Sequence, residues 1–118
     1  MAWGKLDDGF YDNPKIVRIA KRSHGAVGLH ARAISYCAKH LTDGHILADI
    51  VQGFAPLQRD RENMVKVLIE ETAWYENEKG DGFILHDYLD QNPSRAEVEA
   101  KRAEDRERKR KQRAKDNG

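Results

Sequence analysis

The residues most able to do chemistry in this chain are the basic side chains near its C-terminus. Between positions 106 and 115, seven of ten residues are Lys or Arg, and only Glu107 is acidic. Clustered cations neutralise the phosphates of a nucleic acid and release counterions, which gives an affinity that falls steeply with salt. The sequence therefore predicts a phosphate-binding arm made of Arg106, Arg108, Lys109, Arg110, Lys111, Arg113 and Lys115.

The residues just before this arm have a second explanation. Ser94 followed by Glu97 is a capping box, which predicts a helix that begins directly after Ser94. The charges then alternate in sign at spacings that stabilise an isolated helix, as in the pairs Glu97–Lys101 and Glu99–Arg102. This first part of the tail is therefore also explained as a solvated helix, whereas the arm beyond it is not.

A second group of polar and basic residues lies at a helix predicted over residues 61–72. Arginine and asparagine are the residue types that make paired hydrogen bonds to base edges in the major groove. The predicted groove-reading group is Arg59, Arg61, Asn63 and Lys66. An ordinary solvated helix face is the alternative, because four acids in the same segment would repel phosphate: Asp60, Glu62, Glu70 and Glu71.

The tip of a predicted hairpin, "ENEKGDG", adds one cation, Lys79. In this position it would contact the DNA backbone beside the groove. Lys79 is outnumbered by Glu76, Glu78 and Asp81, however. The hairpin is therefore equally open to a contact with a protein.

Other reactive residue types form no recognisable motif. Cys37, His40 and His45 invite a zinc interpretation, but no fourth ligand and no C-x-x-C framework accompany them. His86 and Asp87 are adjacent, yet no nucleophile or glycine-rich phosphate loop stands with them. The sequence thus predicts a protein that is not an enzyme and has no catalytic residue, metal site or cofactor.

Charge is divided unevenly along the 118 residues, although the formal net charge is only +1. Residues 106–118 hold seven basic and two acidic residues (+5), which leaves 14 basic and 18 acidic residues (−4) in 1–105. One cysteine fits a reducing compartment, and no stretch has the apolar length of a membrane span or a signal peptide. We expect a cytoplasmic protein with one domain over 1–92 and a basic helical tail over 93–118, whose end could be disordered.

Apolar periodicity predicts the elements that position these groups. A short amphipathic helix follows Asn13 and Pro14, because proline at the first helical position costs no hydrogen bond. The further elements are a long helix over 25–41, a strand near Ile46, a short helix over 48–53, the helix over 61–72 and a hairpin over 74–86. This mainly α chain with a small β-hairpin (α+β) has the element order of a winged helix-turn-helix. The alternative is a small α+β domain that binds nothing.

Three stretches carry a resemblance to a known group of proteins: "WGKLDDGFYDNPKI", "HLTDGHI" and "AWYENEKGDGFILHDYLDQNPSR". Over roughly residues 3–95 the chain resembles small phage-encoded winged-helix proteins of actinobacterial viruses. It is similar at more distance to the N-terminal domain of phage replisome organisers, the DnaD-like replication initiation proteins. Those initiators continue into a second domain, whereas this sequence stops at Gly118.

The resemblance implies a DNA-binding protein in a bacterial host cell, with a role in replication initiation or in transcriptional regulation. Its expected partner is double-stranded DNA, and no membrane partner is expected. The rival hypothesis is a protein-interaction module whose acidic body and hairpin bind a replication or host protein. A homodimer built on the N-terminal and long helices would also serve that role.

Overall fold

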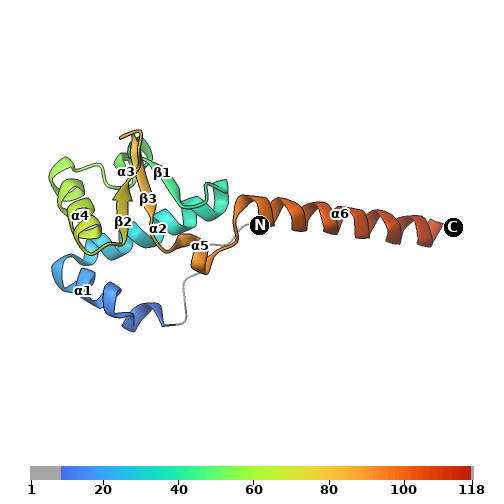
Figure 1. Cartoon of the computed structure of the whole chain (residues 1–118), viewed down its shortest axis with the longest axis horizontal. Helices are drawn as coiled ribbons and strands as arrows, with labels where there is room; N and C mark the ends of the chain where they lie inside the picture. The colour runs from blue at the N-terminus through green and yellow to red at the C-terminus, as the bar shows by residue number, and fades with distance from the viewer. Residues whose placement is uncertain (1–8, 118) are drawn as a thin grey trace.

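The computed structural model describes residues 9–117 as a helical body from which one long helix projects (Figure 1). The leading Trp3 to Leu6 stretch of the resemblance lies outside the described residues. The elements in chain order are η1 (Phe10–Asp12), α1 (Pro14–Arg22), α2 (His24–His40), β1 (His45–Leu47), α3 (Ala48–Phe54), α4 (Gln58–Glu70), β2 (Trp74–Glu76), β3 (Gly82–Leu85), α5 (Tyr88–Gln91) and α6 (Arg95–Asn117).

Helices α1 and α2 begin at polar caps. The Asn13 side chain accepts hydrogen bonds from the backbone N–H groups of Lys15 and Ile16, as the sequence predicts. The Ser23 hydroxyl accepts one from Ala26 and so starts α2. Both helices then bury one apolar side, and these sides form about half of the core: Ile16, Ile19, Ala26, Leu29, Ala33, Ile34 and Cys37.

The three strands form one antiparallel sheet in the order β1-β3-β2. In the hairpin, Trp74 pairs with Leu85, while on the other side of β3 Ile46 pairs with Phe83. The hairpin and the strand near Ile46 are confirmed. Their pairing with each other has no local signal, because α3 and α4 separate them in the sequence. The α+β class, mainly helical with a small antiparallel sheet, is therefore confirmed.

The pairing of β1 with β3 depends on glycine at position 82. A Cβ added to Gly82 would overlap the Ile46 carbonyl oxygen and lie 2.9 Å from the Leu47 Cα. Since these are backbone atoms that cannot turn away, we expect Gly82→Ala to lower the free energy of unfolding by about 1–3 kcal/mol. At Gly28, where an added Cβ meets nothing within 4 Å, alanine should instead raise it by about 0.5–1 kcal/mol. Urea unfolding of the two variants tests this; equal effects would contradict it.

Helices α3 and α4 are joined by a three-residue turn and pack against α2. Helix α4 begins at Gln58, earlier than the predicted start at residue 61. Asp60 lies inside the first turn, and Leu57 occupies the N-cap without a side-chain hydrogen bond. The buried residues of α4 are Val67 and Leu68. The polar side chains of the first turn are consequently left for other contacts.

Helix α6 leaves the body and projects beyond it (Figure 1). Its 23 residues span about 34 Å, since each helical residue rises about 1.5 Å. The radius of gyration, 17.8 Å, therefore exceeds the roughly 13–14 Å of a compact domain of this length. The predicted tail helix is present, and it continues through the basic arm to Asn117 rather than ending before it.

Candidate nucleic-acid interface

One face of α4 presents three side chains that can hydrogen-bond to DNA. Arg59, Asn63 and Lys66 follow one another at steps of four and three residues, which places them on the same side of the helix. All three are exposed, and none makes a side-chain hydrogen bond or ion pair with another described residue. We call these three residues the α4 polar face.

Arg61 does not belong to this face. Its side chain is half-buried, and its Nη1 donates to the carbonyl oxygens of Ala55 at 2.9 Å and Pro56 at 3.4 Å. The guanidinium therefore fixes the turn between α3 and α4. The sequence predicts Arg61 as a groove-reading residue together with Arg59. It does not show that the Arg61 side chain folds back to the carbonyl oxygens of the preceding turn.

Two of the acids of this segment that would repel phosphate are paired with arginines of α1. Glu70 pairs with Arg22 of α1 at 2.6 Å, and Glu71 pairs with both Arg18 and Arg22. The Arg22 hydrogen bond holds the pKa of Glu70 below its usual value. Since α1 supplies these cations, the C-terminal end of α4 is less repulsive to phosphate than its own sequence indicates.

Lys79 lies at the exposed tip of the β2–β3 hairpin. The turn is shaped by Asn77, whose side chain bonds to Asp81 twice, and by Gly80 with a φ of 73°. Glycine at the turn residue with positive φ agrees with the hairpin expected from the sequence. Lys79 remains one cation among acids, so the tip presents only a single positive charge.

The base of α6 is fixed to the body, while the rest is not. The capping box is present, because the Ser94 hydroxyl accepts from the Glu97 N–H at 3.1 Å and contacts its carboxylate at 3.2 Å. The Arg95 N–H donates to Asp43 at 2.6 Å, and the half-buried Val98 lines a groove together with Ala38 and Leu41. Within residues 9–117, no hydrogen bond or ion pair joins the side chains of α6 beyond Arg95 to the body.

The predicted arm residues are all exposed on α6: Arg106, Arg108, Lys109, Arg110, Lys111, Arg113 and Lys115. They do not share a side of the molecule with the α4 polar face. Figure 1 shows α4 near one end of the long axis and α6 projecting from the other. The two basic groups are therefore separate surfaces, which the sequence alone could not establish.

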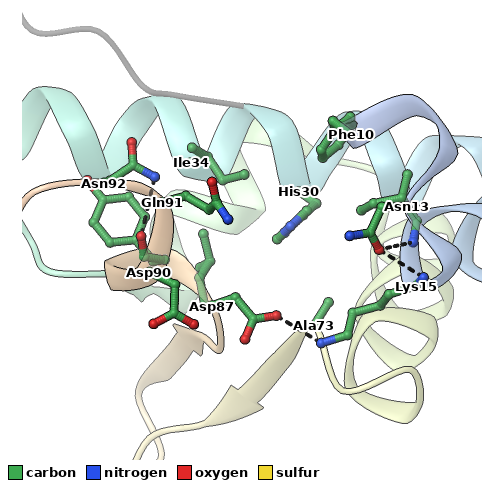
Figure 2. A pocket seen from close by; sticks show the side chains of 13 residues that line it. Phe10, Asn13, Lys15, His30, Ile34, Ala73, Asp87, Asp90, Gln91 and Asn92 are labelled. Carbon is green, nitrogen blue, oxygen red and sulfur yellow. Dashed lines mark hydrogen bonds and ion pairs between the residues drawn. The ribbon is translucent and has the colours of Figure 1, made fainter. Parts of the chain in front are cut away.

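A cavity of about 180 Å³ lies between α1, α2 and α5 (Figure 2). Its polar lining includes Asn13, Lys15, His30, Asp87 and Asn92. Burial, helped by the nearby charge of Lys15, lowers the pKa of His30 to about 4, so its imidazole is neutral at pH 7. The cavity thus offers hydrogen-bonding groups rather than an acid–base pair poised near neutral pH.

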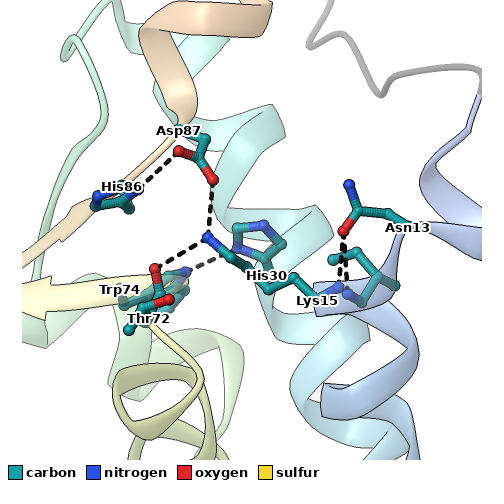
Figure 3. A network of polar contacts seen from close by, with 8 residues as sticks. Asn13, Lys15, His30, Thr72, Trp74, His86 and Asp87 are labelled. Carbon is teal, nitrogen blue, oxygen red and sulfur yellow. Dashed lines mark hydrogen bonds and ion pairs between the residues drawn. The ribbon is translucent and has the colours of Figure 1, made fainter.

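Four of these residues, Asn13, Lys15, His30 and Asp87, also take part in polar contacts with neighbouring segments (Figure 3). Lys15 of α1 donates to Asp87 at 3.0 Å and to the Thr72 carbonyl oxygen at 3.3 Å. Partial burial tends to raise the pKa of Asp87, but the hydrogen bonds from Lys15 and His86 outweigh it and hold that pKa below its usual value. His86 Nδ1 lies 2.7 Å from Asp87 Oδ1. This pair is therefore part of the network of hydrogen bonds that holds the segments together.

His30 is a residue of this region that was not among the candidates predicted from the sequence. Its Nδ1 accepts a hydrogen bond from the Trp74 indole N–H at 2.8 Å. Since an indole nitrogen can only donate, Nδ1 carries no proton and the neutral ring is protonated at Nε2. A histidine within an apolar helical pattern and a tryptophan opening a predicted strand were the only signals of this contact.

Cys37 is buried, and burial raises the pKa of its thiol. His40 and His45 are exposed. Within residues 9–117, no three His, Cys, Asp or Glu side chains are grouped so that they could hold a metal ion. In the same part of the chain, no helix has both the length and the apolarity required to cross a bilayer.

Comparisons of the chain with protein families, with curated proteins and with solved structures found no significant match.

Proposed function

We propose that residues 9–92 form a winged helix-turn-helix that binds double-stranded DNA. In this proposal α3 and α4 are the helix pair, α4 enters the major groove, and the β2–β3 hairpin is the wing. The order of elements and the β1-β3-β2 sheet beside α4 support it. The protein has no catalytic role in this proposal.

The observation that carries the proposal is the composition of the α4 polar face. Asn63 can form two hydrogen bonds with the major-groove edge of an adenine, and Arg59 can form two with that of a guanine. Lys66 supplies a charge for a flanking phosphate. Arg22 neutralises Glu70 close to this face. The side chains of the α4 polar face make no hydrogen bond or ion pair in the described chain and are therefore available to a ligand.

The process served is replication initiation or transcriptional control in a phage-infected bacterium. This part rests on the resemblance of the sequence to phage winged-helix proteins and to DnaD-like initiators. In both cases the partner is duplex DNA and the protein acts in the host cytoplasm.

Selection of binding sites from a randomised duplex library tests the α4 polar face. We expect Asn63→Ala to relax the preference at one base position, at a cost of about 1–3 kcal/mol for the preferred base. The pair Arg59→Ala and Lys66→Ala should weaken binding and reduce the slope of log affinity against log salt by up to about 2.

The matched control removes two exposed cations elsewhere on the body, Lys21 of α1 and Lys39 of α2. Replacing both by alanine lowers the net charge equally but should leave the selected sequence unchanged. If the control and the α4 variants lose the same affinity and neither alters the selected site, α4 does not read the groove.

A second candidate function is supported by an apolar groove of about 390 Å³ between α3, α4 and β3. Its apolar lining includes Val51, Val65, Ile69 and Phe83, and its charged lining consists of two acids and two cations, Glu62, Glu70, Arg61 and Lys66. An apolar groove of this kind suits an amphipathic segment of a protein partner. Val65→Asp should abolish binding of such a partner and leave the salt slope for duplex DNA unchanged.

A further inference from the structure

The cations of α6 are not equivalent. Arg102, Arg106, Lys109 and Arg113 follow one another at steps of four, three and four residues. At about 100° per residue, these steps keep all four within roughly 60° of the helix circumference. The acids between them, Glu104, Asp105 and Glu107, fall outside this arc. We call the four residues the α6 stripe.

The ion pairs of α6 do not involve the stripe. Arg95 pairs with Glu99 at 3.0 Å, Arg108 with Asp105 at 3.2 Å, and Arg110 with Glu107 at 2.6 Å. These are not the pairs expected from the sequence. No residue of the α6 stripe has an ion-pair partner among residues 9–117, and all four are exposed.

The opposite side of α6 has a different character. Lys101, Arg108, Lys111 and Lys115 lie there within a comparable arc, but Glu97 and Glu104 lie among them. The arc of the α6 stripe therefore contains only positive charge, whereas the opposite arc is of mixed charge. A tail that served only as a solvated tether would gain nothing from this separation.

We propose that the α6 stripe binds the phosphate backbone of duplex DNA, at a surface separate from α4. In this proposal the opposite side of α6, which holds Arg108, Lys111 and Lys115 of the arm predicted from the sequence, does not contact phosphate. The stripe covers about 16 Å along the helix, and duplex DNA presents one charge per roughly 1.7 Å, so several phosphates lie within its reach. The inference rests on the proposed function, since it takes duplex DNA to be the ligand. Because the stripe and α4 lie toward opposite ends of the long axis, the stripe adds affinity without changing the preferred base sequence (Figure 1).

Two full-length variants of equal charge test the stripe. The stripe variant carries Arg102→Gln, Arg106→Gln, Lys109→Gln and Arg113→Gln. The control variant carries Lys101→Gln, Arg108→Gln, Lys111→Gln and Lys115→Gln on the opposite side. Circular dichroism confirms that both keep the helix, and affinity for a 30-base-pair duplex is measured between about 50 and 200 mM salt, the range in which phosphate contacts dominate.

The stripe variant should lose about 10²–10³-fold in affinity at 0.1 M salt and about 3–4 units of salt slope, as expected for four lost phosphate contacts. The control variant should lose less than about 1 unit of slope. The base preference selected by the stripe variant should equal that of the unmodified chain.

Other outcomes separate the failure of this inference from failure of the proposed function. Equal losses in the two variants, or none in the stripe variant, would overturn the stripe while the unmodified chain still binds DNA. If the unmodified chain binds no duplex, the proposed function fails as well. If poly-glutamate displaces the duplex at equal charge concentration, the stripe binds an acidic protein instead and the inference is wrong.

Discussion

Replacing Trp74 by alanine is expected to lower the free energy of unfolding by about 3–5 kcal/mol. The indole is 1% exposed, stands at the start of β2 and packs on Phe83 with ring centres 5.5 Å apart. Removing it leaves a large cavity and leaves His30 without its hydrogen-bond donor. Because small domains are stable by only about 5–15 kcal/mol, this single change removes much of the total.

Two further variants separate the packing of Trp74 from its hydrogen bond. Trp74→Phe keeps most of the apolar contact but loses the indole N–H, and should cost about 1–3 kcal/mol less than alanine does. Tyr75, the next residue of β2, is 45% exposed, so Tyr75→Ala should cost less than about 1 kcal/mol. Urea unfolding at pH 7 measures all three. A similar loss for Trp74→Ala and Tyr75→Ala would show that the core is not organised around the indole.

The free energy of unfolding is expected to fall by about 3 kcal/mol through His30 as the pH falls from 6.5 to 4. Burial lowers the pKa of this imidazole from 6.5 to about 4 in the folded chain, with a further contribution from Lys15 and an opposing one from Asp87. Between these two pH values the unfolded chain binds a proton that the folded chain does not. The stability from a neutral His30 is therefore fully present above pH 6.5, and it is lost as the pH approaches 4.

His30→Asn isolates this effect from the other titrating groups. An asparagine side-chain oxygen can still accept the Trp74 N–H, but it does not titrate, so the variant should lose less stability between pH 6.5 and 4. His24→Asn, which removes an exposed imidazole from the same helix, is the matched control. Unfolding in urea at several pH values gives the two profiles. Parallel profiles for His30→Asn and the unmodified chain would show that His30 titrates normally in the folded protein.

Local patterns were sufficient for most individual elements. Asn13 with Pro14 marks the start of α1, Ser94 with Glu97 marks the start of α6, and the glycine-containing turn marks the hairpin. Each of these signals acts between residues only a few positions apart, so the sequence displays it directly. Less was predictable at α4, where the start was placed three residues late because Leu57 caps the helix without a polar side chain.

The sequence by itself determined the kinds of residue available: an acidic body, cations on a candidate helix of that body, and a basic helical tail. Only the tertiary structure decided which of these cations are available for binding. It ties Arg61 to a turn and leaves Arg59 exposed, and it brings Arg22 to Glu70 from another helix. These contacts join residues whose proximity depends on how the helices pack. Charge and propensity are properties of single residues, whereas the availability of a charged group depends on what the fold places beside it.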